Sequence, residues 1–435
     1  MTDSDASAEH PMLDLNFDAP MPRQPSQPRA SRTKKPSARR SESAGEALER
    51  RVGRLEFAEG AFVRLRAPVR INAEAGRDVL TDLDVVAVDI DGRLRVSRSI
   101  LECKSGTGQS GEPDRLLWLA GLRAFMGGPR AVLVRNTVST RGRHIAQQLG
   151  IETMDMNRIS EREAAIGWVP DAFAHLGGAE CALAERRSDE LLKTISSIPN
   201  DLIAFLRHDF LFFPRRILGI LADLGATIES TPLPQPVDLV VGGHALIALI
   251  YAAITDAESL DFVSRTAVEA RLARAFTVGS VDSNLLEVLG QADAIMAHVV
   301  EQIHSSYEAT GVSRKNVQIP RLRDIVAEAP TWIPRYVDFV EALRANPNVG
   351  RDLLQTAELA CFEALVGGQA HEFQAFDHLF TIEHRQLLRL ALRLLEELTG
   401  PQLIHALGAL RSVRFDRSAP AIPDRRGRPR RAEQS

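Results

Sequence analysis

Cysteine is scarce in this 435-residue chain. Its three cysteines, Cys103, Cys181 and Cys361, stand far apart in the sequence. No pair has the CxxC spacing of a zinc cluster, and isolated thiols do not form a disulfide framework. The sequence therefore excludes a small disulfide-stabilised fold. This cysteine usage is typical of the reducing cytoplasm, where we expect the protein to reside.

Long uninterrupted apolar runs are also missing. Residues 1–20 are acidic and polar and lack the basic start and apolar run of a secretory signal. The most apolar segment, 237–254, contains Asp238 and His244 and is broken by a Gly-Gly pair. Its uninterrupted part falls well short of the roughly 20 residues that cross a bilayer. We expect a buried helix here and no contact with a membrane.

Charge is distributed unevenly along the chain. Residues 19–40 hold seven basic and no acidic residues, and residues 411–435 have a net charge of +5. Residues 45–163 have a net charge of +2, whereas residues 164–410 have −12. An anionic polymer such as DNA should be drawn to the N-terminal part and to both tails. Both tails, 1–43 and 412–435, are also rich in Pro, Ser and Arg, and this composition predicts disorder.

Segment 44–166 has the pattern of an α/β domain. Apolar spacing predicts helices at 45–58, 114–126 and 143–149, and apolar or alternating runs predict strands at 62–66, 83–88, 93–104, 130–134 and 151–154. Asp91-Gly92 is a hairpin turn signal between the second and third strands. This order predicts a mixed sheet with helices on both faces.

Segment 180–411 reads as a larger, mainly α-helical domain whose role the sequence does not indicate. Its phenylalanines Phe205, Phe210, Phe212 and Phe213 favour a core over a base-stacking platform. Ten helices are expected, near 183–197, 199–208, 213–224, 239–254, 258–276, 282–309, 333–345, 349–366, 383–398 and 401–411. Scattered histidines, His208, His244, His298, His304, His371, His378, His384 and His405, lack HExxH spacing, and we expect no metal site among them.

Three charged residues carry the chemistry. Asp84 lies at the head of one predicted strand, and Glu102 lies on the strand that returns from the Asp91-Gly92 turn. A hairpin brings both carboxylates to one end of the sheet, and Glu102 and Lys104 share a face because they are two residues apart. Carboxylate oxygens suit a hard cation, and an adjacent lysine can orient a metal-bound water. These are the groups that metal-dependent phosphodiester hydrolysis needs.

The stretch Leu83-Asp84-Val85-Val86 with Leu101-Glu102-Cys103-Lys104 resembles the D…ExK core of the PD-(D/E)xK nuclease superfamily, which includes restriction endonuclease-like and Holliday-junction-resolvase-like enzymes. The resemblance covers residues 45 to about 160. It implies a restriction-endonuclease-like α/β fold and Mg²⁺ or Mn²⁺ held by Asp84, Glu102 and a helical glutamate. Glu49 matches that glutamate, and Glu46 is the alternative.

Several alternatives stay open. Asp82 shares a face with Asp84 and could replace it as a ligand. Glu102 and Lys104 could instead form a plain cross-strand ion pair. The chain departs from some relatives because no Gln-xxx-Tyr follows the ExK strand; Gln109 lies in a Gly/Ser loop. That loop, 105–111, is not a P-loop because no Gly-Lys-Ser/Thr ends it.

The C-terminal stretch Arg426-Gly427-Arg428-Pro429-Arg430-Arg431 resembles an AT-hook core, in which arginines enter the narrow minor groove of A·T-rich DNA. We therefore expect Arg426, Arg428 and Arg430 to contact DNA, either as such a hook or as a generic basic tail.

The resulting hypothesis is a Mg²⁺-dependent DNA endonuclease with Glu49, Asp84, Glu102 and Lys104 in its active site, acting in defence against foreign DNA or in DNA repair. The alternative is a catalytically inactive DNA-binding protein that recruits a partner through its helical domain. RNA cleavage is a third, weaker hypothesis. In each case the helical domain could bind a protein partner or form a homodimer.

Overall fold

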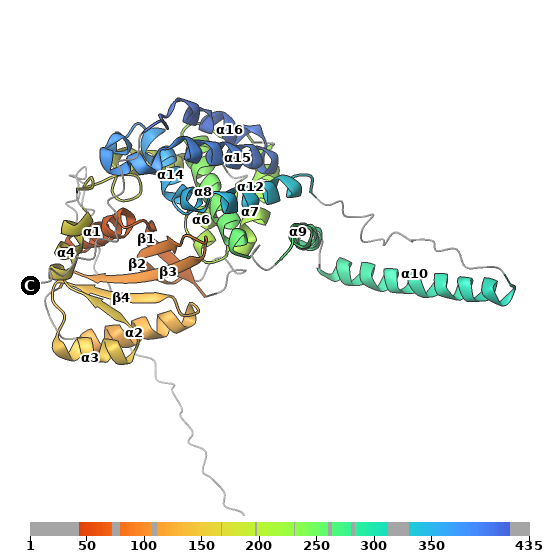
Figure 1. Ribbon diagram of the computed structural model, residues 1–435, viewed down its shortest axis with the longest axis horizontal. Helices are drawn as coiled ribbons and strands as arrows, with labels where there is room; N and C mark the ends of the chain where they lie inside the picture. The colour runs from red at the N-terminus through yellow and green to blue at the C-terminus, as the bar shows by residue number, and fades with distance from the viewer. Residues whose placement is uncertain are drawn as a thin grey trace, which may run out of the picture. The chain divides into compact units, whose positions relative to one another are not determined.

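The computed structural model describes residues 43–71, 79–106, 111–166, 168–195, 198–229, 231–259, 263–279, 283–311 and 330–417. Within them, a mixed β-sheet occupies the N-terminal part and the rest is mostly helical (Figure 1). The expected order of an α/β part followed by a helical part is confirmed. Arg426, Arg428 and Arg430, the tails 1–42 and 418–435, and Gln109 lie outside the described residues.

Five strands form one sheet in the order β1-β2-β3-β4-β5. They are β1 (Phe62–Arg70), β2 (Val79–Ile90), β3 (Val96–Lys104), β4 (Arg130–Arg135) and β5 (Glu152–Met154). β2 is antiparallel to both β1 and β3, whereas β4 runs parallel to β3 and β5 parallel to β4. The first three strands therefore form a meander, and the last two are added through helical crossovers.

Four helices accompany the sheet: α1 (Ala44–Ala58), α2 (Glu112–Phe125), α3 (Thr140–Gln148) and α4 (Met156–Ile166). α1 packs against β1, β2, β3 and α4, while α2 packs against β4 and α3. Figure 1 shows the α1/α4 pair and the α2/α3 pair on opposite sides of the sheet. Helix α4 was not predicted, because its eleven residues bury only Ile159 and so carry little apolar periodicity.

Local signals account for the element boundaries near the candidate site. Ser43 and Glu46 form a capping box at the start of α1, with Glu46 Oε2 accepting a hydrogen bond from Ser43 N at 2.9 Å. At the β2–β3 turn, Asp91 Oδ1 accepts hydrogen bonds from the backbone N–H groups of Arg93 and Arg95. The predicted hairpin is therefore closed by its own aspartate.

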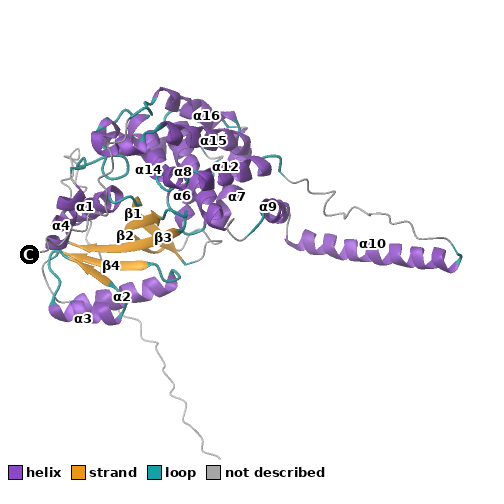
Figure 2. Ribbon diagram, viewed as in Figure 1, coloured by secondary structure: helices purple, strands orange, loops and turns teal. Residues whose placement is uncertain are grey.

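The helical part begins after α4; Figure 2 draws all helices, including α1 to α4, in purple and the strands in orange. Its α-helices are α5 (Ala179–Leu192), α6 (Asn200–Arg207), α7 (Ile217–Glu229), α8 (Val237–Ser259), α9 (Arg265–Gly279), α10 (Ser283–Ala309), α12 (Ile333–Ala345), α13 (Pro347–Gly350), α14 (Leu353–Leu359), α15 (Ile382–Thr399) and α16 (Pro401–Leu407). A π-helical turn, Ala360–Ala364, continues α14. Each helix expected from the sequence has a counterpart here, and the expected core residues Phe205 and Phe210 are buried.

Helix α8 is the centre of this part. It packs against α5, α6, α7, α12, α14, α15 and α16. Its segment Val237–Glu258 is long and apolar enough to cross a membrane, but 89% of the most apolar 18-residue window in it is buried inside the protein. The expectation of a buried helix is confirmed, and its apolarity on all sides follows from having neighbours on all sides.

Buried polar contacts join the sheet to the helices. Arg64 on β1 and Glu358 on α14 are both buried, and Arg64 Nη1 lies 2.8 Å from Glu358 Oε2. Burial alone would raise the pKa of Glu358, but Arg64 and His175 lower it to about 2. Gln355 of α14 donates to the carbonyls of Phe57 and Ala61 at the α1–β1 connection. α14 is thereby fixed on the meander.

Removing the arginine of this pair should destabilise the protein strongly. In Arg64→Met the carboxylate of Glu358 stays buried without its guanidinium partner, and the free energy of unfolding should fall by about 3–5 kcal/mol. Chemical denaturation at pH 7 measures this loss. Arg158→Met is the matched control, because the Arg158–Glu161 pair is exposed and its loss should change stability by under about 1 kcal/mol. Equal effects of the two substitutions would contradict the assignment.

Candidate active site

The candidate site lies where β2 and β3 meet at one end of their ladder. At this end, the last paired residues of β2 and β3 are Val85 and Leu101. Asp84 precedes Val85 on β2, and Glu102 follows Leu101 on β3, so both lie just beyond this pair. Asp84 Oδ2 accepts a hydrogen bond of 2.7 Å from the backbone N–H of Cys103. The Asp84 carboxylate therefore satisfies a donor at the end of the ladder and is held against β3.

Lys104 joins the two carboxylates. Its Nζ lies 3.3 Å from Asp84 Oδ2 and 2.6 Å from Glu102 Oε1. Cys103, between Glu102 and Lys104, is buried, whereas Lys104 is partly exposed. The structure thus brings Asp84, Glu102 and Lys104 together, as the hairpin argument requires.

Glu49 comes from α1, near the end of β3. A Cβ placed on Gly45 would lie 3.9 Å from Glu49 Oε1 and 4.0 Å from Ser105 Oγ, which follows Lys104. Glu49 Oε2 accepts a hydrogen bond of 2.9 Å from Arg66 Nε. Glu46, the alternative ligand, is engaged in the capping box and in an ion pair with Arg66. Glu49 is therefore the better placed of the two glutamates.

Two arginines that the sequence did not single out complete the site. Arg115, in the first turns of α2, forms an ion pair with Glu102 Oε1 and lies over the Trp118 ring at 4.4 Å from its centroid. Arg66 lies within β1, has a φ of 52° and forms ion pairs with both helical glutamates, Glu46 and Glu49. Arg115 follows the ExK strand at the start of the next helix, which is the signal that could have found it. Nothing in the sequence pattern marks Arg66.

The charges around the site keep the amine of Lys104 protonated. Partial burial opposes the charge of Lys104, but its hydrogen bond to Glu102 and the carboxylates of Glu102 and Asp84 raise its pKa. Burial raises the pKa of Glu102, and the Asp84 charge adds to the shift while Lys104 and Arg115 oppose it. Burial raises the pKa of the Cys103 thiol well above its usual value, and Asp84, Glu49 and Glu102 reinforce the shift. The thiol therefore stays protonated and is no nucleophile.

The candidate ligands offer carboxylate oxygens, which are the ligands that a hard cation prefers. Glu102 is only 3% exposed, and its Oε1 is held by Lys104 Nζ at 2.6 Å and by Arg115. A metal ion at this oxygen would have to displace one of these two side chains. The oxygens of Glu49, Asp84 and Glu102 do not all reach ligand spacing; in the described part of the chain, the group of three ligand atoms within 4.8 Å of one another is His175, Glu185 and His244.

The remaining candidates lie elsewhere. Asp82 is exposed and sits opposite Pro68 on the β1 side of β2. Asp91 closes the hairpin turn at the other end of the strands. Residues 107–110 of the Gly-rich loop lie outside the described residues, but Ser105 O at its start accepts a hydrogen bond from Asn136 Nδ2 after β4.

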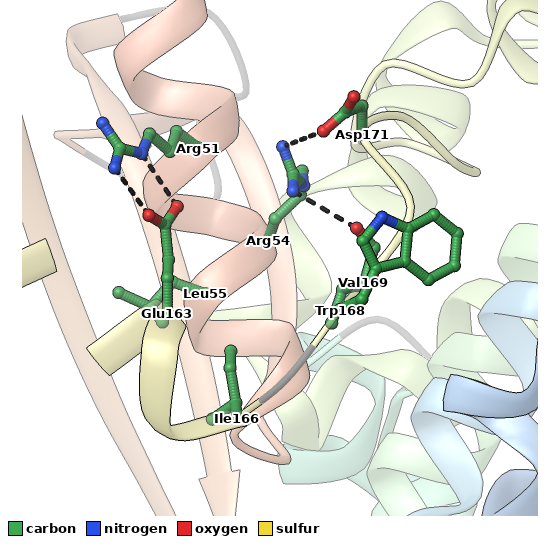
Figure 3. Close-up of a pocket in the computed structure, with 8 residues that line it drawn as sticks. All are labelled: Arg51, Arg54, Leu55, Glu163, Ile166, Trp168, Val169 and Asp171. Atoms are coloured by element: carbon green, nitrogen blue, oxygen red, sulfur yellow. Dashed lines mark hydrogen bonds and ion pairs between the residues drawn. The ribbon is translucent and has the colours of Figure 1, made fainter. Parts of the chain in front are cut away.

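A separate hollow lies between α1, the end of α4 and the segment that follows it. Figure 3 shows Arg51 pointing at Glu163 and Arg54 at Asp171, with Trp168 alongside. Trp168 is 65% exposed and meets Phe373 edge to face. Each arginine here has an acidic partner, so the hollow presents little net positive charge, and we assign it no chemistry.

Comparison with known proteins adds no family. A scan against family models, a search of curated proteins and a search of solved structures each gave no match. The interpretation of the site therefore rests on its residues and geometry.

Neutralising Glu102 should stabilise the fold at neutral pH. Its pKa is raised in the folded protein, so the ionised carboxylate lowers stability above that pKa and has no effect below the unfolded value of 4.5. Glu102→Gln should therefore unfold at a higher denaturant concentration than the wild type at pH 7, and the difference should vanish as the pH falls below 4.5. Glu161→Gln, at an exposed position, is the control. A Glu102→Gln protein that is less stable at pH 7 would contradict the assigned direction.

Proposed function

We propose that the protein is a metal-dependent endonuclease that hydrolyses DNA phosphodiester bonds. The observation that carries the proposal is the meeting of Asp84, Glu102 and Lys104 at one end of the β2–β3 hairpin. The order helix, three-strand meander, helix, strand agrees with the resemblance to the PD-(D/E)xK superfamily, and a restriction-endonuclease-like fold is part of the proposal.

Each residue has a role that its surroundings support. Asp84 and Glu102 would hold Mg²⁺ or Mn²⁺ through carboxylate oxygens, with Glu49 as a third ligand from α1. The bound ion would activate water and offset charge on the phosphate. Lys104 stays protonated beside both carboxylates, so it can donate a hydrogen bond to the attacking water or to a phosphate oxygen. Arg115 and Arg66 lie close enough to the carboxylates to contact a bound phosphate.

DNA is the favoured substrate because of the charge distribution. The segment that holds the site has a net charge of +2, both tails are basic, and segment 164–410 has −12. Phosphate attraction should therefore act near the site and along the arms, including Arg426, Arg428 and Arg430, and should weaken steeply with salt. Defence against foreign DNA and DNA repair are the cytoplasmic roles that suit such an enzyme.

Plasmid nicking tests the proposal. The full-length wild type should relax supercoiled DNA with Mg²⁺ or Mn²⁺ and not with a chelator. Asp84→Ala and Lys104→Ala should lose at least about 10²-fold in rate, because each removes a group that acts on developing charge. Asp82→Ala is the matched control on the same strand and should keep its activity; the reverse result would make Asp82 the ligand.

Three other outcomes separate the competing functions. Equal rates for the wild type and both site variants would refute catalysis at this site. Salt-sensitive DNA binding without cleavage would favour an inactive nuclease fold that recruits a partner. Faster cleavage of RNA than of duplex DNA would favour the third hypothesis.

We also propose that α10 binds a second copy of the chain. Its apolar residues Val288, Ile295, Val299 and Ile303 are all exposed and recur at about helical spacing. When two copies are related by a two-fold axis, the stripe of one α10 faces the same stripe of the other. The two helices can then pair and bury each other's apolar residues.

Molar mass in solution tests this pairing. The wild type should be a dimer by size exclusion with light scattering, and Ile295→Glu/Val299→Glu should be a monomer. Ala297→Glu places the same charge at an exposed position on the opposite face of α10 and should leave the dimer intact. A monomeric wild type at tens of micromolar would contradict the proposal.

A further inference from the structure

Two histidines and a glutamate from distant parts of the sequence meet inside the helical part. His175 lies in the segment between α4 and α5, Glu185 lies on α5, and His244 lies on α8. Glu185 Oε1 is 2.6 Å from His244 Nε2 and 3.2 Å from His175 Nε2. One ligand atom from each residue lies within 4.8 Å of the other two.

This spacing is close to that of a zinc site. Zn–N and Zn–O bonds of about 2.0–2.1 Å at tetrahedral angles place neighbouring ligand atoms about 3.3 Å apart. The distance of 3.2 Å between His175 Nε2 and Glu185 Oε1 is already close to this value. The distance of 2.6 Å between His244 Nε2 and Glu185 Oε1 would have to lengthen by less than about 1 Å. Side-chain rotation alone can supply a change of that size.

The surroundings have the outer contacts of a metal-binding histidine. His175 Nδ1 lies 2.6 Å from Glu358 Oε1, which leaves Nε2 directed at Glu185. A carboxylate on the remote ring nitrogen fixes the orientation and raises the basicity of a ligating imidazole. Glu185 Oε2 in turn lies 2.7 Å from Arg207, so only Oε1 remains for a metal.

The cluster is rigid yet reachable. The Phe362 ring, on the π-helical turn, lies 4.3 Å from the His175 ring and 4.6 Å from the His244 ring. A π-helical turn inserted into an α-helix is frequent at functional sites. His244 is buried, but the side chains of His175 and Glu185 are 19% and 17% exposed, so two of the three ligands keep some contact with solvent.

We propose that His175, Glu185 and His244 bind one divalent transition-metal ion of the zinc class. The ion would tie the segment before α5, and α5 itself, to the central helix α8, and a water molecule would complete its four ligands. Two imidazoles and one carboxylate select this class over Mg²⁺, which prefers oxygen ligands. The site is therefore chemically distinct from the carboxylates of Asp84 and Glu102 and is independent of the proposed nuclease activity.

Metal counting on the full-length, tag-free protein tests the proposal. The protein is stripped with a chelator, dialysed against Zn²⁺ and then against buffer, and analysed by elemental mass spectrometry. The wild type should keep one equivalent and gain several degrees in melting temperature, because the ion binds the folded state. Co²⁺ in place of Zn²⁺ should give the visible absorption of a low-symmetry site. Glu185→Gln and His244→Gln should lose the equivalent, the thermal gain and the cobalt spectrum.

Two controls exclude other sites. His384→Gln removes a histidine as buried as His244 but hydrogen-bonded to Thr381 on α15, and it should keep the equivalent. Asp84→Ala should keep it too. If Asp84→Ala alone releases the ion, the ion belongs to the carboxylate site, and the present inference fails while the nuclease proposal stands.

The number of zinc ions that the wild type retains tests the proposal without any variant. A wild type that keeps no zinc after dialysis would overturn the proposal even if a variant fails to fold, and so would an equal count in all variants. In either case the cluster would be a plain hydrogen-bonded network.

Discussion

A chain of buried charges holds the two parts of this protein together. Arg64 on the sheet contacts Glu358 on α14, and Glu358 contacts His175 ahead of α5. A buried ion without its partner is costly, so each of these groups fixes the position of the next. The meander and the helices also share one continuous hydrophobic core.

The candidate active site depends on that alignment indirectly. β1 carries Arg64 toward the helices and, two residues later, Arg66 toward Glu49 on α1. Arg66 has a positive φ, although the register of β1 against β2 is the same on both sides of it. The strand that is anchored by a buried ion pair therefore also positions the side chain that faces the helical glutamate of the site.

The two clusters suit different ions for simple reasons. At the end of the hairpin, Asp84 and Glu102 offer only oxygens, and the charge of Lys104 lies between them, which suits a hard cation and a phosphate. Between α5 and α8, imidazole nitrogens dominate, and arginines occupy the outer carboxylate oxygens. Lys104, beside the first set of ligands, can also act on a phosphate or on an attacking water. The second set has three protein ligands, so a bound ion of the zinc class would keep one position for water.

The sequence by itself determined the elements and the core of the site. Period-two and helical patterns gave the strands and nearly all helices, and the two-residue spacing of Glu102 and Lys104 placed them on one face, because these are local constraints. Only the tertiary structure decided which other side chains join the active-site residues and which residues form the second cluster. Arg66 and Arg115 join the site, and His175, Glu185 and His244 meet, through contacts between segments far apart in the chain, and no local periodicity encodes such contacts. The expectation of no metal site among the scattered histidines came from their spacing along the chain, and that spacing does not report distances across a core.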